Sequence, residues 1–189
     1  TYLTNYSGDF YIRQTVADKD IIFKADDGSG GTETYFFLDG SFSSGNPFTV
    51  FPDLAELAFG DSKDLRIKHD GTDSYITELN NDLYIINRGD DKDIIFQCDD
   101  GSGGTETYFY LDGSISSGNP FTVFPDNSIL QFGTDTDLYL YSDGGSNSYI
   151  KNSNGHLQLI QYANDKDIIF KCDDGSGGEE TYFFLDGSY

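Results

Sequence analysis

Pairs of aspartates followed by glycines recur along the chain, and their carboxylates are the groups best suited to bind a metal ion. The string DDGSGG occurs at residues 26–31, 99–104 and 173–178. Carboxylates with flexible glycines between them can wrap a hard cation such as Ca²⁺, which takes about six to eight oxygen ligands. This pattern allows a weak calcium site in each turn, formed by Asp26, Asp27, Asp99, Asp100, Asp173 and Asp174.

The same residues are also ordinary turn formers. Glycine accepts positive φ angles, and aspartate bonds to the backbone two residues further on. The strings lack the bidentate glutamate of an EF-hand loop, and they do not match the glycine-rich nonapeptide of calcium-binding β-rolls. Turn formation and cation binding therefore both stay open, and no other cofactor is expected.

Catalysis is not expected from these acids. A glycosidase uses two carboxyl groups in one cleft and in different environments, whereas here the same acids return at every turn. The two histidines, His69 and His156, align with Ser142 and Asp82 and so do not recur. The sequence predicts no catalytic residue and no enzymatic activity.

The two cysteines occupy one equivalent position. Cys98 and Cys172 align with Ala25, which suggests a small, buried slot. They are expected to be free thiols rather than parts of a disulfide scaffold.

Composition excludes several classes of protein. The chain has 33 acidic and 11 basic residues and a formal charge of -22, so it would repel nucleic acid. Aromatic residues make up 16%, which is too many for a disordered chain. No apolar run approaches the roughly 20 residues of a membrane span.

The elements that carry these turns belong to a long internal repeat. Residues 18–53 and 91–126 differ at four of 36 positions, an offset of 73 residues, and a third copy begins at Asp165. We divide the chain into modules 1–73 and 74–147 and a partial module 148–189. Long tandem repeats are typical of fibres, solenoids and arrays.

Each module is expected to be a meander of short strands. Residues 64–69 and 137–142 alternate with period two, which places Leu65, Ile67, Leu138 and Leu140 inward. Hairpins are expected for 137–150, for 93–111 and for 82–94. The outward Tyr139 and Tyr141 are the better candidates for a sugar-contacting surface, although Arg66 and Lys68 take their places in the first module.

The runs IIF and YFFL show no alternation, which is typical of strands covered on both faces. One chain of hairpins does not easily supply both covers, and a second chain could. The fold class is therefore all-β, an elongated repeat protein of short-strand meander modules, with an intertwined homotrimeric fibre as the favoured case. A single-chain β-solenoid is the alternative.

The strings DKDIIFQCDDGSGGTETYFYLDGS, FPDNSILQFGTDTDLYLYSDGGSNSYI and DLYIINRGDDKDIIF resemble repeats of virion structural and tail-fibre-like proteins of marine bacteriophages, notably those of cyanobacteria. The resemblance covers essentially the whole chain. It implies an elongated, trimeric, extracellular virion appendage whose host-binding region, and any contact with host glycans, lies elsewhere in a longer protein. One turn departs from the pattern, because KHDG at 68–71 becomes YSDG at 141–144.

These observations favour a structural shaft segment that associates with itself, binds no nucleic acid and does not span a membrane. Two alternatives stay open. One is an extracellular adhesin repeat stiffened by calcium, and the other is a subunit of a head-to-tail β filament.

Overall fold

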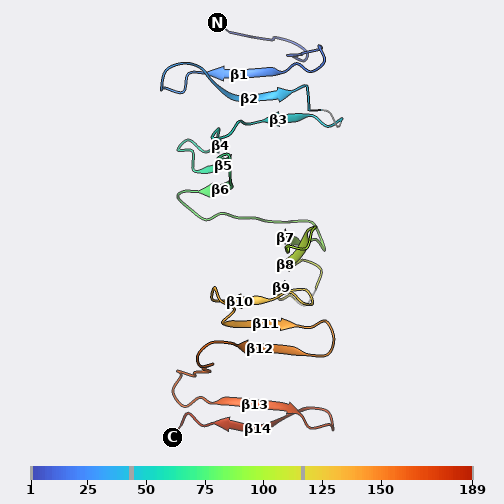
Figure 1. Ribbon diagram of the computed structural model, residues 1–189, viewed down its shortest axis with the longest axis vertical. Coiled ribbons are helices and arrows are strands. Elements are labelled where there is room, and N and C mark those ends of the chain that lie inside the picture. The colour runs from blue at the N-terminus through green and yellow to red at the C-terminus, as the bar shows by residue number, and fades with distance from the viewer. Residues whose placement is uncertain (1, 43–44, 116–117, 189) are drawn as a thin grey trace. The chain divides into compact units, whose positions relative to one another are not determined.

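The computed structural model describes residues 2–42, 45–115 and 118–188, and over these ranges it contains fourteen strands and no helix (Figure 1). The all-β prediction is confirmed. None of the described residues belongs to a helix that could cross a membrane.

The strands repeat with the sequence. The first set is β1 Ile21–Ala25, β2 Glu33–Asp39, β3 Phe48–Val50, β4 Leu57–Phe59, β5 Leu65–His69 and β6 Ser74–Glu78. The second set is β7 Ile94–Cys98, β8 Glu106–Asp112, β9 Phe121–Val123, β10 Leu130–Phe132, β11 Leu138–Ser142 and β12 Ser148–Asn152. The third set, β13 Ile168–Asp173 and β14 Glu179–Leu185, matches β1 and β2.

Every described strand pairs with its neighbour in sequence, and every pair is antiparallel. The result is four three-stranded sheets, β1-β2-β3, β4-β5-β6, β7-β8-β9 and β10-β11-β12, and the two-stranded hairpin β13-β14. By internal contacts the chain divides into Thr1–Ile85 and Ile86–Tyr189. The predicted module boundaries at 73/74 and 147/148 fall just before β6 and β12, inside the β5-β6 and β11-β12 hairpins. The start of a repeating unit is a matter of choice, so these boundaries do not separate structural units.

Period-two alternation sets the strands of the smaller sheets. Ile67 pairs with Leu57 on one side and with Ile76 on the other, so the three apolar side chains share one face. Leu140 pairs in the same way with Leu130 and Ile150. The alternation is confirmed, as are the hairpins β7-β8 and β11-β12, but the predicted inward burial is not.

The expected hairpin over 82–94 is wrong. Residues 82–86 belong to no strand and make no backbone hydrogen bond with any described residue. The sequence analysis did not predict two short strands. These are β3 and β9, each with the sequence Phe-Thr-Val, and each adds a third strand to its sheet. The alternation of 82–86 is therefore not matched by a paired strand among the described residues.

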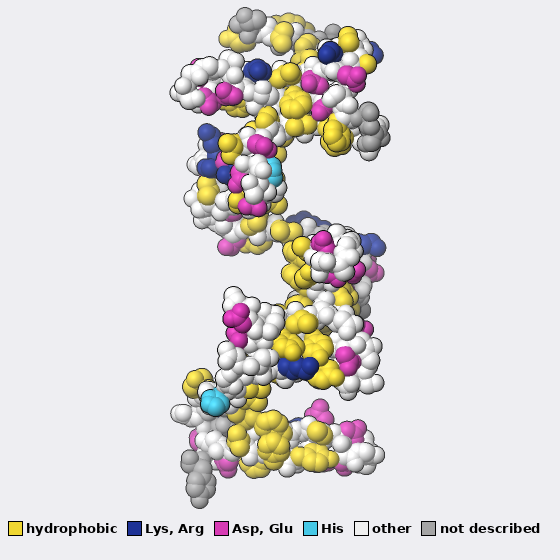
Figure 2. All heavy atoms as spheres, viewed as in Figure 1, with side chains coloured by type: hydrophobic (Ala, Val, Ile, Leu, Met, Phe, Trp, Pro, Cys, Tyr) yellow, Lys and Arg dark blue, Asp and Glu magenta, His cyan; other side chains and the backbone are white. Residues whose placement is uncertain are grey.

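Within the described residues the chain has no core. No side chain there is buried, and Figure 2 shows hydrophobic side chains on the surface along the molecule. The chain exposes 15993 Å², whereas a folded monomer of its 21.0 kDa would expose about 9,000 Å². Of the expected inward positions, Leu65, Leu138 and Leu140 are only half-buried in their sheets, and Ile67 is 42% exposed.

Both faces of the larger sheets carry apolar side chains. Ile21 pairs with Leu38 and Phe23 with Phe36, while the intervening pair Ile22 and Phe37 points to the opposite face. Ile22 is 53% exposed and Leu38 is 41% exposed. The sequence predicts strands covered on both faces, and the single chain buries neither face fully, since Phe36 and Phe37 are half-buried.

Candidate functional site

Each acidic turn uses its carboxylates to hold its own backbone. The Oδ1 atom of Asp26 accepts a hydrogen bond from the Gly28 N–H at 2.7 Å. The Oδ1 atom of Asp27 accepts two, from the Ser29 N–H at 2.9 Å and the Ser29 hydroxyl at 2.6 Å. The same bonds form at Asp99, Asp100, Asp173 and Asp174.

Hydrogen bonds to the ionised form also set the electrostatics of these turns. The serine hydroxyl, and then the serine N–H, lower the pKa of Asp27, Asp100 and Asp174. No group of three His, Cys, Asp or Glu side chains in the described ranges lies close enough to hold one metal ion. The contacts thus account for the turns by backbone bonding, and calcium binding stays a prediction.

A further aspartate organises the turn between β11 and β12. Asp143 accepts hydrogen bonds from the Asn147 side chain at 3.0 Å, the Gly145 N–H at 3.0 Å, the Asn147 N–H at 3.2 Å and the Tyr149 hydroxyl at 3.2 Å. These donors, the Asn147 amide first, lower the pKa of Asp143 to about 2. This carboxylate fixes the turn over residues 143–147, and its accepting capacity is largely used.

Three tyrosines and a lysine gather on one face of the β10-β11-β12 sheet. The ring of Tyr141 stacks on Tyr139 at 5.8 Å and on Tyr149 at 4.8 Å between centroids. Lys151 Nζ lies 4.7 Å from the centroid of the Tyr149 ring and 2.9 Å from the Tyr141 hydroxyl. That hydroxyl is the main cause of a raised Lys151 pKa. In Figure 2 basic side-chain atoms lie among hydrophobic ones over this sheet.

This stack bears on the expected sugar surface. A sugar ring packs on a free aromatic face, whereas Tyr141 already stacks on two tyrosines and has Lys151 Nζ 5.1 Å from its ring centroid. In the first module Glu56 bridges Arg66 at 3.4 Å and Lys68 at 3.7 Å instead. In the second module the tyrosines and the lysine thus pack against one another across the strands, and in the first module an ion-pair network takes their place.

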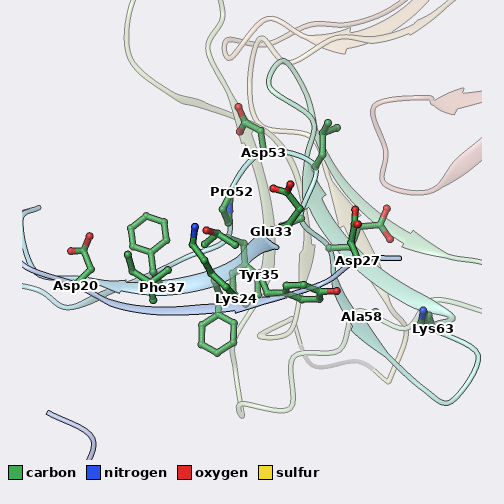
Figure 3. Close-up of a pocket in the computed structure, with 17 residues that line it drawn as sticks. Asp20, Lys24, Asp27, Glu33, Tyr35, Phe37, Pro52, Asp53, Ala58 and Lys63 are labelled. Carbon is green, nitrogen blue, oxygen red and sulfur yellow. The ribbon is translucent and has the colours of Figure 1, made fainter. Parts of the chain in front are cut away.

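An open hollow of about 1000 Å³ lies in the first module beside β1, β2 and the segment before β4 (Figure 3). Its apolar lining includes Ile22, Phe36 and Phe51, and its charged lining includes Lys24, Glu33 and Asp53. Figure 3 shows the charged side chains coming from several elements around it rather than converging on one point. Of the predicted calcium ligands only Asp27 lines it.

The remaining reactive side chains are isolated. Nδ1 of His69 lies 3.1 Å from the Ser74 hydroxyl, a contact across the β5-β6 turn. Cys98 and Cys172 are free, as predicted, but the expected buried slot is wrong, because both are exposed at edge strands. Burial of small residues is inferred from size, and an edge strand without a cover leaves any residue exposed.

Rows of stacked phenylalanines are the feature that the sequence did not reveal. Phe36 stacks on Phe23 at 4.5 Å and on Phe51 at 5.7 Å. Phe109 repeats the row with Phe96 and Phe124, and Phe170 stacks on Phe183 in the third set. Phe23 and Phe36 are direct cross-strand partners, as are their equivalents, and a register shift follows each pair. Hydropathy alone does not reveal which residues of two strands are partners.

Comparison with known protein families, with characterised proteins and with solved structures finds no match for this chain.

Proposed function

We propose that the chain is a structural shaft segment of a viral appendage of the phage tail-fibre type, built from three copies wound together. One observation carries the proposal. No described residue is buried in the single chain, although both faces of its larger sheets carry isoleucine, leucine and phenylalanine. Such surfaces stay soluble and ordered only when something covers them.

The area involved is of the size found between permanently associated subunits. The chain exposes about 7,000 Å² more than a folded monomer of its mass would. Obligate interfaces bury roughly 2,000–5,000 Å² or more. A partner of this kind is a constitutive part of the fold rather than a transient ligand.

The role that follows is mechanical. Each module would bury its apolar faces against neighbouring copies, so stability would grow with the number of modules. The dense negative charge would keep separate rods from associating further. In the virion such a rod would hold a host-binding region, which lies outside this chain, at a distance from the particle. It would need no enzymatic activity and no nucleic acid.

Sedimentation velocity on the isolated chain, with a frictional ratio, tests the proposal. The expected result is a discrete, elongated species near three times 21.0 kDa. A stable monomer at micromolar concentration would overturn the proposed assembly and favour the alternative, a single-chain β-solenoid. A species that lengthens with concentration would indicate the head-to-tail filament, and a calcium-dependent change in shape would indicate the adhesin repeat.

A further inference from the structure

Three extended segments of the chain pair with no strand among the described residues. They occupy equivalent positions before β1, β7 and β13, at residues 9–13, 82–86 and 156–160. None makes a backbone hydrogen bond with any described residue. Each is long enough to be an average strand.

Their sequences are those of strands with one apolar face. Phe10, Leu83 and Leu157 are equivalent, and two residues later come Ile12, Ile85 and Leu159. The position between them varies from Tyr11 and Tyr84 to Gln158. Two apolar positions kept with period two around a tolerant one indicate a half-buried strand. Yet Leu83 is 46% exposed and Ile85 61% exposed.

The end of each segment is fixed by a side chain instead of a strand ladder. The Asn87 amide donates to the Asp93 carbonyl at 2.8 Å and its Oδ1 accepts from the Gly89 N–H at 2.9 Å. Gln14 and Gln161 bond the corresponding turns through their Oε1 atoms. The turn into β7 is therefore formed, while residues 82–86 stay free to pair elsewhere.

Open strand edges complement these segments. β1, β7 and β13 each pair on one side only within the described chain, and each is an edge strand. Unpaired edges recruit strands from other chains unless they are covered. Addition of an extended segment to such an edge supplies backbone hydrogen bonds for affinity and alternate side chains for specificity.

We infer that these three segments are intermolecular strands, each pairing with an open sheet edge in a second copy of this chain. The inference rests on the proposed assembly and gives its mode of interlocking. A partner that serves all three segments must present equivalent edges at the same period of 73 or 74 residues. A second copy meets that condition because it carries the same repeat, whereas an unrelated protein would need a repeat of matching length.

Hydrogen–deuterium exchange of the full chain, read on peptides covering 81–88, tests the inference directly. In the assembly the amides of 82–86 are expected to exchange at least about tenfold more slowly than free amides. The protection should disappear on dilution to the monomer. Sedimentation of the same samples reports the assembly independently.

Matched variants locate the effect on the apolar face. Leu83→Asp combined with Ile85→Asp is expected to abolish protection of 82–86, because it places charges in the pairing face. Tyr84→Gln, which copies the third module, should leave protection and mass unchanged.

Three results would count against the inference. An assembled species whose 82–86 amides exchange freely would overturn the strand pairing and leave the shaft proposal standing. Protection that persists in the dilute monomer would mean pairing within one chain. A chain that stays monomeric at every concentration would overturn both proposals.

Discussion

Phe23 on β1 and Phe36 on β2 stack with their ring centroids 4.5 Å apart and their planes at 15°. The pair returns as Phe96 with Phe109 at 4.5 Å and as Phe170 with Phe183 at 4.3 Å. Phe96 is nevertheless 39% exposed in the chain. A row of stacked rings that recurs at each module and faces water is suited to become the apolar centre of an assembly.

Phe96→Ala is expected to lower the stability of the assembly by roughly 3–5 kcal/mol per copy, the usual cost of removing a buried phenyl ring. Thermal unfolding followed by circular dichroism measures it. Phe37→Tyr is the control, because the second module carries Tyr110 there and should tolerate the change. A loss from Phe96→Ala no greater than the control's would mean that the ring stays in water after assembly.

The acidic turns can be separated into backbone and cation roles at Asp100. Asp100→Asn keeps an oxygen that accepts from Ser102 but loses the charge that these bonds favour, so the melting temperature in calcium-free buffer should fall less than in Asp100→Ala. Asp100→Ala removes both bonds and should lower it by about 2–4 °C. A calcium-induced rise in melting temperature that Asp100→Asn abolishes would instead establish the cation site.

Local features of this fold could be predicted from sequence because their causes are local. Alternation in Leu65 and Ile67 fixes which residues share a face, and Asp-Gly strings fix the turns. Burial and pairing are not local. The segment containing Leu83 looks like the first arm of a hairpin, yet it pairs with no strand among the described residues. The exposure of Cys98 could not be predicted either, because burial depends on what packs against a strand and not on residue size alone.

The site was predictable to a similar extent. The sequence predicts that Asp26 and Asp27 cap turns or bind a cation, and their bonds to Gly28 and Ser29 are in place. The stacking of Tyr141 on Tyr149 could not be foreseen, because it depends on the register between β11 and β12. The same register pairs Lys68 with Tyr75 in the first module, so the extra residue in the later turn does not change the pairing.

Gly113 is expected to be intolerant of a side chain. A Cβ atom there would collide with the backbone carbonyl of Lys92, where the end of β8 meets the start of β7. The Gly113 N–H also donates to Asp93 Oδ1 at 2.9 Å. Gly113→Ala should cost about 1–3 kcal/mol, as overpacking usually does, measured by urea unfolding.

The matched control is Gly145→Ala, since Thr72 occupies the equivalent place in the first module. It should leave the urea midpoint nearly unchanged. Equal losses from the two variants would mean that the close approach to Lys92 does not constrain the hairpin.

The last prediction concerns pH. The pKa of Asp143 is about 2 in the folded chain, below its ordinary value of 3.8, because four donors favour the charged form. A lowered folded pKa contributes stability that is complete above about pH 4 and is lost as the pH falls toward 2. The melting temperatures of the wild type and Asp143→Ala should therefore differ most above pH 4 and converge near pH 2. Carbon-13 NMR of the carboxyl group checks the cause, and titration of Asp143 near 3.8 would show that its donors do not hold the charge.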